Sequence, residues 1–239
     1  MTNHYAINTI HRAPGATSAE SVNQVPKHVE KPEELNSSLL GILAFLGFFG
    51  GAILITYAYD NAAVGASHFT TFWLGMILGL TPATLLAVSR RTRKGTQVGL
   101  LLGMAIFTTL PEFFLTLHGP DDADADSHFR QLLDTIQTGH LFTPNVTEPL
   151  NQNFPGLESA STALHAVSGL DALQCADITI FLAHCLTPLI VFLLALRFGL
   201  GPTVPVLAAI VYMANPSYMF FDNQYAYESF CLLYTSRCV

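Results

Sequence analysis

The residues best suited to chemistry lie in the stretch GPDDADADSHFR, at positions 119–130. Four aspartates fall within six positions there, and His128 and Arg130 follow at once. An aspartate such as Asp124 or Asp126 can act as a general base that takes a proton from an acceptor hydroxyl. Alternatively, Asp124, Asp126 and His128 can bind a divalent cation, since carboxylate oxygens suit Mg²⁺, Ca²⁺ or Mn²⁺. Arg130 is suited to a phosphate oxygen.

Two simpler interpretations of this acidic cluster involve no chemistry. Aspartates near a helix N-terminus are stabilised by the helix dipole, and Asp126 or Ser127 is suited to be the N-cap. That interpretation accounts for one or two aspartates, but adjacent carboxylates repel one another and raise each other's pKa. The other possibility is a solvated acidic loop.

The elements that position this cluster are membrane-spanning helices. The chain is 51% hydrophobic and only 11% charged. Five stretches of about 20 residues, the length that crosses a bilayer, carry almost no charge. A spanning backbone must satisfy its own hydrogen bonds in lipid, so we predict an all-α polytopic membrane protein with about five transmembrane helices. The five stretches are Leu39–Tyr59, Phe69–Ser89, Gly95–Pro111 with its continuation to Leu117, Ile178–Leu196 and Phe198–Phe221.

The basic residues predict the orientation of these spans. Arg90, Arg91, Arg93 and Lys94 form the one dense basic cluster, between spans two and three. The positive-inside rule makes that loop cytoplasmic. The N-terminus is then cytoplasmic too, and residues 119–177 form an extracytoplasmic loop. We therefore expect a multi-pass membrane protein with its N-terminus in the cytoplasm.

Within residues 119–177 the hydrophobic period predicts two short amphipathic helices. Phe129, Leu132, Leu133 and Ile136 follow the helical spacing and end at Gly139. A second run goes from Leu157 to Leu164 and ends at Gly169. Such helices beside spans usually lie in the plane of the membrane interface.

A second polar group follows span five, in the sequence FFDNQYAYESF, on the same predicted side as the acidic loop. Tyr227 and Glu228 are candidate substrate-binding residues there, together with His128 and Arg130. Aromatic residues favour the membrane interface, so anchoring alone also explains Tyr225 and Tyr227. Two further ionisable groups lie at membrane depth, Glu112 and His184.

The two ends of the chain differ in character from the rest. Residues 1–37 are polar and have no apolar period, which predicts a disordered cytoplasmic tail. The last nine residues, CLLYTSRCV, back-translate into an inverted sequencing adapter that ends in a stop codon, so we expect residues 231–239 to be an adapter-derived scar. The predicted parts are thus 1–37, three spans in 38–118, the outer loop 119–177, two spans in 178–230, and the scar. The net charge of −7 gives no support for nucleic-acid binding.

The runs DADADSHFRQLLDTIQTGHLFTPN, NFPGLESASTALHAVSGL and ANPSYMFFDNQYAYES resemble the polytopic glycosyltransferases of the GT-C superfamily, in a bacterial branch. Asp124 and His128 match the spacing of an acid-x-x-x-His motif. The resemblance implies transfer of a sugar from a polyprenyl-phosphate donor to an acceptor hydroxyl on the extracytoplasmic face, with an aspartate of the first large outer loop as the base. The usual outer loop follows span one, whereas here it follows span three. The resemblance implies no required cofactor, and a divalent cation stays open.

The alternatives are non-enzymatic. Glu112, His184 and Glu228 can form a charge path in a transporter or flippase subunit, or the chain can be a structural membrane protein with a solvated acidic loop. If the chain instead belongs to a glycosyltransferase, we expect it to be an N-terminal fragment of that enzyme, and we expect the fragment alone to be inactive.

Overall fold

The computed structural model of the chain is described by residues 35–62, 68–116, 119–120, 123–146, 148–149, 151–199, 201, 203–227 and 229–230. The predicted tail before residue 35, the predicted scar and Glu228 lie outside the described residues. The described part is all-helical, as predicted. Its elements are α1 (Leu35–Ala62), α2 (Phe69–Val88), α3 (Lys94–Thr108), α4 (Leu110–Thr116), α5 (Ala123–Thr138), η1 (Asn151–Asn153), α6 (Gly156–Ser168), α7 (Ala172–Arg197), α8 (Val204–Met213) and the π-turn η2 (Ser217–Phe221).

Four of the helical segments are long and apolar enough to cross a membrane, which makes the chain a multi-pass membrane protein. They are Leu39–Ala62, Phe69–Val88, Lys94–Thr116 and Ala172–Arg197. The third of these is interrupted between α3 and α4. Pro111 has no backbone N–H to donate, so the helical hydrogen bond to the carbonyl of Phe107 is lost at that point.

The fifth predicted span was wrong. Residues 198–221 form the ten-residue helix α8 and the separate turn η2 instead of one long helix. Ten residues rise about 15 Å, roughly half of the hydrocarbon core. The helix ends before Asn215-Pro216, a dipeptide that disfavours helical backbone at the residue before proline.

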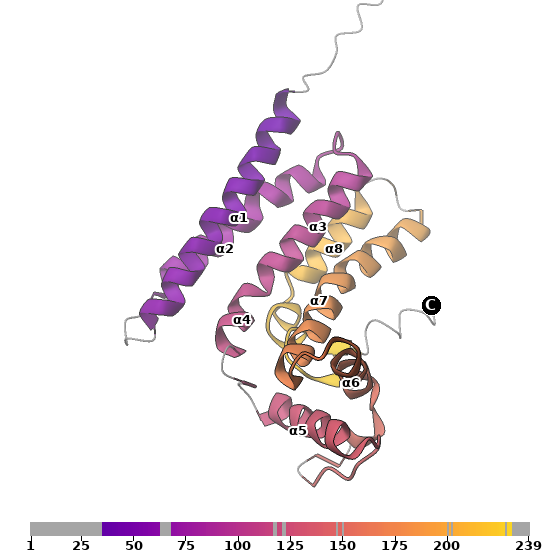
Figure 1. Cartoon of the computed structure of the whole chain (residues 1–239). Helices are drawn as coiled ribbons and strands as arrows, with labels where there is room; N and C mark the ends of the chain where they lie inside the picture. The colour runs from indigo at the N-terminus through magenta and orange to yellow at the C-terminus, as the bar shows by residue number, and fades with distance from the viewer. Residues whose placement is uncertain are drawn as a thin grey trace, which may run out of the picture. The chain divides into compact units, whose positions relative to one another are not determined.

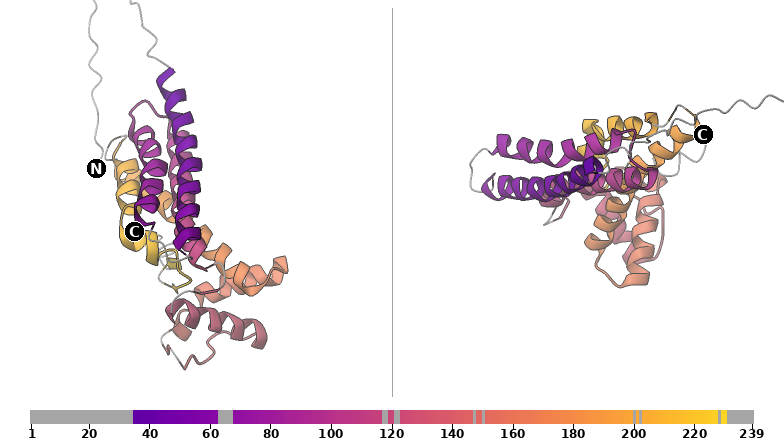
Figure 2. Two further views of the ribbon diagram at one scale, coloured as in Figure 1. Left: turned by 90° about the vertical axis from the view of Figure 1, so that its left-hand side faces the viewer. Right: turned by 90° about the horizontal axis from the view of Figure 1, so that it is seen from above.

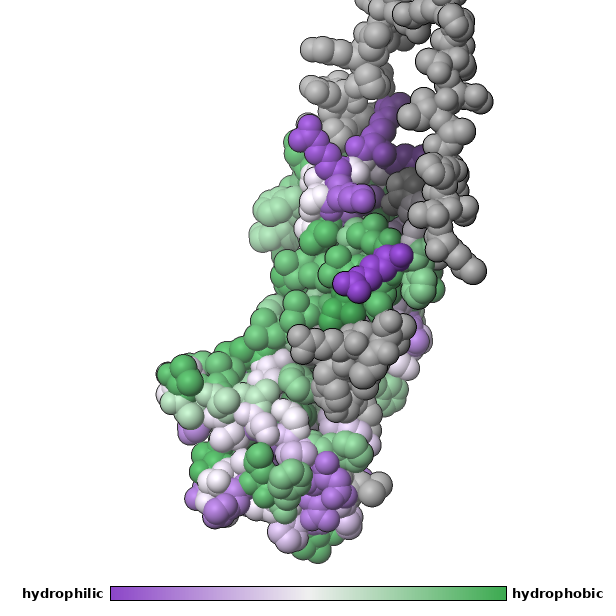
Figure 3. Space-filling view, turned by 90° about the vertical axis from the view of Figure 1, so that its right-hand side faces the viewer, coloured by the Kyte–Doolittle hydropathy of each residue, from purple (hydrophilic) through white to green (hydrophobic). Residues whose placement is uncertain are grey.

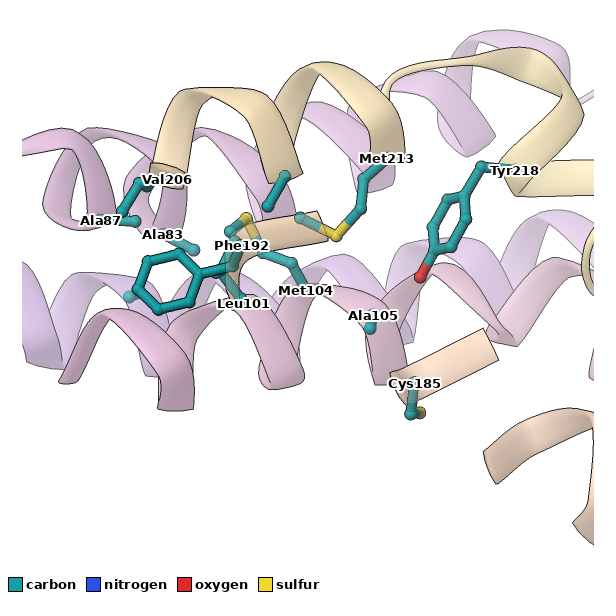
Figure 4. Packing of buried hydrophobic residues seen from close by; sticks show 12 residues of the cluster. Ala83, Ala87, Leu101, Met104, Ala105, Cys185, Phe192, Val206, Met213 and Tyr218 are labelled. Carbon is teal, nitrogen blue, oxygen red and sulfur yellow. The ribbon is translucent and has the colours of Figure 1, made fainter. Parts of the chain in front are cut away.

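The spanning helices pack around one apolar cluster. Figure 4 shows side chains of α2, α3, α7 and α8 meeting there, among them Leu101, Phe192 and Val206. Tyr218, which follows α8, closes the cluster and is fully buried. On the outside, hydrophobic side chains cover the face over the spanning helices, whereas the end that holds α5 and α6 has a mixed polar surface (Figure 3).

Helices α5 and α6 lie crosswise at the end of the spanning helices where α4 ends and α7 begins (Figure 1 and Figure 2). A second apolar cluster holds them there, formed by Ala125 and Leu132 of α5, Leu157 of α6, Ile180 of α7, and Tyr225. Both amphipathic helices were predicted, and both end at the predicted glycine with a positive φ, +69° at Gly139 and +72° at Gly169.

Glycines bring α1 and α2 into close contact. A Cβ on Gly51 would lie 2.6 Å from the carbonyl oxygen of Gly75 and 2.9 Å from the ring of Phe107. We expect Gly51→Leu to push the helices apart and to cost about 1–3 kcal/mol of unfolding free energy. Thermal unfolding in detergent checks this. The matched control is Gly99→Leu, at an exposed glycine of α3 where an added Cβ meets nothing within 4 Å. Equal melting temperatures for the two variants would contradict the close contact of α1 with α2.

Candidate functional site

A buried histidine–glutamate pair joins α5 to α6. His128 Nδ1 lies 2.9 Å from Glu158 Oε1, and neither side chain is exposed to solvent. The amphipathic face of α5 carries His128 inward, beside Leu132, and Glu158 follows Leu157 on the inner face of α6. A buried imidazole and a buried carboxyl group thus join α5 to α6. A proton on Nδ1 is donated to the carboxylate, which directs Nε2 away from Glu158.

Asp124 is the exposed neighbour of this pair. It precedes His128 by one turn of α5, and its Oδ1 lies 4.0 Å from His128 Nε2. Its side chain is 44% exposed, in contrast to the two buried groups behind it. The three residues therefore form an array that runs from a buried carboxylate through an imidazole to a carboxylate at the surface.

Asp126 and Arg130 lie on a different side of α5. Arg130 Nε donates to Asp126 Oδ2 at 2.8 Å, and the arginine is 69% exposed. Residues two apart on a helix are separated by about 200° of rotation, so Asp126 cannot share the face of Asp124. His128 and Arg130, both candidate substrate-binding residues, are also two positions apart and therefore lie on different faces of α5, the first buried and the second exposed. The N-cap expectation is corrected, because α5 begins at Ala123 and both aspartates lie in its first turn.

The described residues of α5 offer no set of ligands for the cation alternative. Among the described residues, no three His, Cys, Asp or Glu side chains lie close enough together to hold a metal ion. The physical reason is the same rotation of α5: Asp124 approaches His128, whereas Asp126 turns to Arg130.

The segment after η2 packs onto this array. The ring of Tyr227 lies 5.3 Å from that of His128 and stacks on Phe154 at 5.1 Å, measured between ring centroids. Tyr225 donates its hydroxyl to Ser161 Oγ at 3.0 Å. Burial raises the pKa of Tyr225, so the hydroxyl stays a donor. Tyr225 is thus a core residue and not an interfacial anchor. Tyr227, from the polar stretch after η2, thus contacts His128 of the acidic stretch.

Sequence reasoning missed Glu158 of this site, and it also missed the buried amide of Asn151 in η1. Both are fully buried. Glu158 Oε2, His128 Nε2 and both amide atoms of Asn151 have no hydrogen-bond partner among the described residues. Buried polar atoms are paired in most proteins, so such a concentration is characteristic of functional sites. The available signal for Glu158 was an acid on the apolar face of a predicted amphipathic helix.

Beside the array lies a cavity of about 430 Å³. It is bounded by α4 and the start of α7, and α5 contributes Ala125 and Phe129. Glu112, one of the ionisable residues at membrane depth, lines it. His184 does not; it lies in the span core, where Nε2 is 3.1 Å from the hydroxyl of Thr108 and its ring stacks on Tyr218. The structure thus places Glu112 and His184 in different environments.

Comparisons with known proteins do not assign the chain to a family. No protein-family model, no curated protein and no solved structure matches the chain. The established description is therefore that of an all-helical multi-pass membrane protein with a buried His–Glu pair beneath an exposed aspartate.

Proposed function

We propose that the chain belongs to a membrane glycosyltransferase that moves a sugar from a polyprenyl-phosphate donor to an acceptor hydroxyl. The observation that carries the proposal is the array of Asp124, His128 and Glu158 at the end of the spanning helices. The resemblance of the surrounding motifs to GT-C enzymes agrees with it. The basic loop between α2 and α3 supports an extracytoplasmic site, in the bacterial inner membrane, with a cytoplasmic N-terminus.

Asp124 is the general base in this proposal. Its carboxylate takes the proton of the acceptor hydroxyl while the hydroxyl oxygen forms a bond to the anomeric carbon of the sugar. The bond from that carbon to the phosphate oxygen breaks, and the polyprenyl phosphate leaves as an anion that needs no strong acid. Asp124 ends the step protonated and returns its proton to water.

His128 and Glu158 position the base and do not contact the sugar, since both are fully buried. The pair fixes the first turn of α5 against α6, which holds Asp124 in one place. Positioning of this kind contributes to rate because reacting groups must meet at a defined distance. Tyr227, stacked on Phe154 and tilted against the ring of His128, packs behind the array.

Arg130 is the candidate for the donor phosphate. Its guanidinium is exposed and held by a single carboxylate, Asp126. Exposed ion pairs of this kind are worth at most about 1 kcal/mol, so a phosphate can replace Asp126 as the partner. Guanidinium groups bind phosphate oxygens in a bidentate manner.

The test is a transfer assay with the full-length protein in membrane vesicles. Polyprenyl phosphates that carry radiolabelled glucose, mannose, galactose or arabinose are supplied to the outer face. We expect protein-dependent release of free polyprenyl phosphate from at least one donor. A folded protein that releases none of them, and that instead carries ions or lipid across the vesicle membrane, would replace the transferase by the transporter alternative.

A further inference from the structure

The connection between α2 and α3 carries four exposed cations. We call residues 89–94 the basic turn; its cations are Arg90, Arg91, Arg93 and Lys94. The sequence has no Asp or Glu from residue 61 to 111 or from 178 to 221. The ion pairs found among the described residues lie in α5 and α6, and none of them includes a cation of the basic turn. The part of the chain that the structure describes thus offers these four charges no acidic partner.

The end of α2 does not explain these cations. Basic side chains near a helix C-terminus often bind its last carbonyl oxygens. Here the hydroxyl of Thr92 donates to the carbonyl of Leu86 at 2.6 Å, and the backbone N–H of Ser89 donates to the same carbonyl at 3.2 Å. The buried side-chain amide of Gln97 donates to the carbonyl of Ala87 at 3.0 Å. Neutral groups therefore satisfy these two carbonyl groups.

The same hydrogen bonds hold the basic turn in a defined shape. Thr92 fastens the turn to the last turn of α2, and its backbone N–H donates to the carbonyl of Ser89 at 3.0 Å. Gln97 joins α3 to α2 across the turn. The four cations thus project from an ordered backbone, so a ligand that binds them has to order only their side chains.

The basic turn lies where two spanning segments reach the membrane surface. The segment Phe69–Val88 ends directly before it, and the segment Lys94–Thr116 begins in it. Figure 3 shows hydrophilic residues at the end of the hydrophobic face that is far from α5 and α6. Leu85, one turn before the end of α2, is 61% exposed. A lipid whose chains lie against α2 at this depth brings its headgroup to the basic turn.

An anion is the ligand that this arrangement favours. Arg93 is the N-cap of α3 and Lys94 is its first residue, where the positive end of the helix dipole also lies. The cations and the dipole repel one another, and a bound anion relieves that repulsion. Guanidinium groups bind phosphate oxygens in a bidentate manner. A choline headgroup suits the turn less well, because it brings a cation of its own.

We propose that the basic turn binds the phosphate of an anionic phospholipid whose headgroup carries no cation, such as phosphatidylglycerol. The acyl chains lie along the exposed apolar side of α2 at Leu85. Clusters of four or more Lys and Arg next to a spanning helix attract anionic lipids in this way. The binding is independent of sugar transfer and of the site at α5.

Native mass spectrometry tests this binding. The full chain, purified in a maltoside detergent, is offered equal amounts of phosphatidylglycerol and phosphatidylcholine with identical acyl chains. We expect about fivefold or more retention of phosphatidylglycerol over phosphatidylcholine. Arg91→Gln should lower the binding of phosphatidylglycerol about fivefold, and Arg91→Gln with Arg93→Gln about 25-fold. Both variants keep Arg90 and Lys94, which preserves the orientation of the spans.

Two further variants make the test specific to the basic turn. Arg91→Lys should keep most of the binding, because an ammonium group also binds phosphate. Arg197→Gln is the matched control, since it removes one exposed cation at the end of α7, outside the turn, and should leave the binding nearly unchanged. Equal losses for Arg91→Gln and Arg197→Gln would assign the effect to overall charge and overturn the turn as the site.

Three other results would overturn the lipid as the ligand. Equal retention of the two lipids would remove the preference for an anionic head. Release of bound phosphatidylglycerol by millimolar inorganic phosphate would make a free anion the ligand. Binding that is absent in the unaltered chain and arises only after Glu30, Glu33 and Glu34 are replaced by glutamine would make the acidic segment before α1 the occupant.

Discussion

Replacement of Asp124 by asparagine in the full-length protein is expected to lower sugar transfer by about 10²–10⁴-fold, the contribution of a general base. Asparagine keeps the size of the side chain and removes its basicity, so binding of donor and acceptor should change little. The measurement is the initial rate of polyprenyl phosphate release, at equal amounts of protein in the membrane.

Two variants on the same helix make this prediction specific. Asp126→Asn loses only the exposed pair with Arg130, and we expect less than about a tenfold effect, since such pairs are worth about 1 kcal/mol or less. Asp134→Asn, exposed on α5 away from its first turn, should leave the rate unchanged. Equal losses for Asp124→Asn and Asp126→Asn would assign the effect to the charge of the whole cluster and remove Asp124 from the role of base.

Replacement of Glu158 by leucine is expected to destabilise the packing of α5 on α6 by about 1–3 kcal/mol, because it leaves a buried hydrogen-bonding group of His128 without its partner. His128 Nδ1 would lose its 2.9 Å contact inside the core of α5 and α6. The double variant His128→Leu with Glu158→Leu should regain most of the loss, since an apolar replacement of a complete buried pair is often neutral. Glu148→Leu, at an exposed position, is the control.

Cysteine reactivity measures this stability locally. Cys175 lies buried at the start of α7, near α6, and Cys185 lies buried in the span core. With Cys231 and Cys238 replaced by serine, a maleimide dye reports each region as it opens on heating. Glu158→Leu should expose Cys175 at a lower temperature while Cys185 reacts as before. If the double variant is as unstable as Glu158→Leu, the broken His128–Glu158 pair is not the cause of the lost stability.

The spans were predictable because lipid imposes one strong constraint on sequence. A helix in a bilayer needs a long run without charge, and the runs that became α1, α2, α3–α4 and α7 satisfy it. The same criterion failed at residues 198–221, since a hydropathy run measures length and polarity but not the helix-breaking effect of Pro216. The amphipathic helices were predictable for a comparable reason: spacing and a terminal glycine are local signals.

The candidate site was predictable only in part. Composition drew attention to the aspartates, but Asp124 lies one helical turn from His128 only because α5 already begins at Ala123, ahead of the N-cap expected at Asp126 or Ser127. Glu158 became visible only in three dimensions, since its partner lies 30 residues away in the chain. The burial of Glu158 depends on its hydrogen bond with His128, and this pairing cannot be deduced from a single sequence.

The contacts that Tyr225 makes with α6 and Tyr227 makes with α5 have a consequence for biosynthesis. The ribosome makes α5 and α6 long before it makes these tyrosines, so the loop reaches its side of the membrane without the ring that lies on His128 and the hydroxyl that bonds Ser161. The site is complete only after the segment that follows α8 has been synthesised and has packed onto α5 and α6. Until then the packing of α5 and α6 lacks these two contacts, so the site around His128 is incomplete.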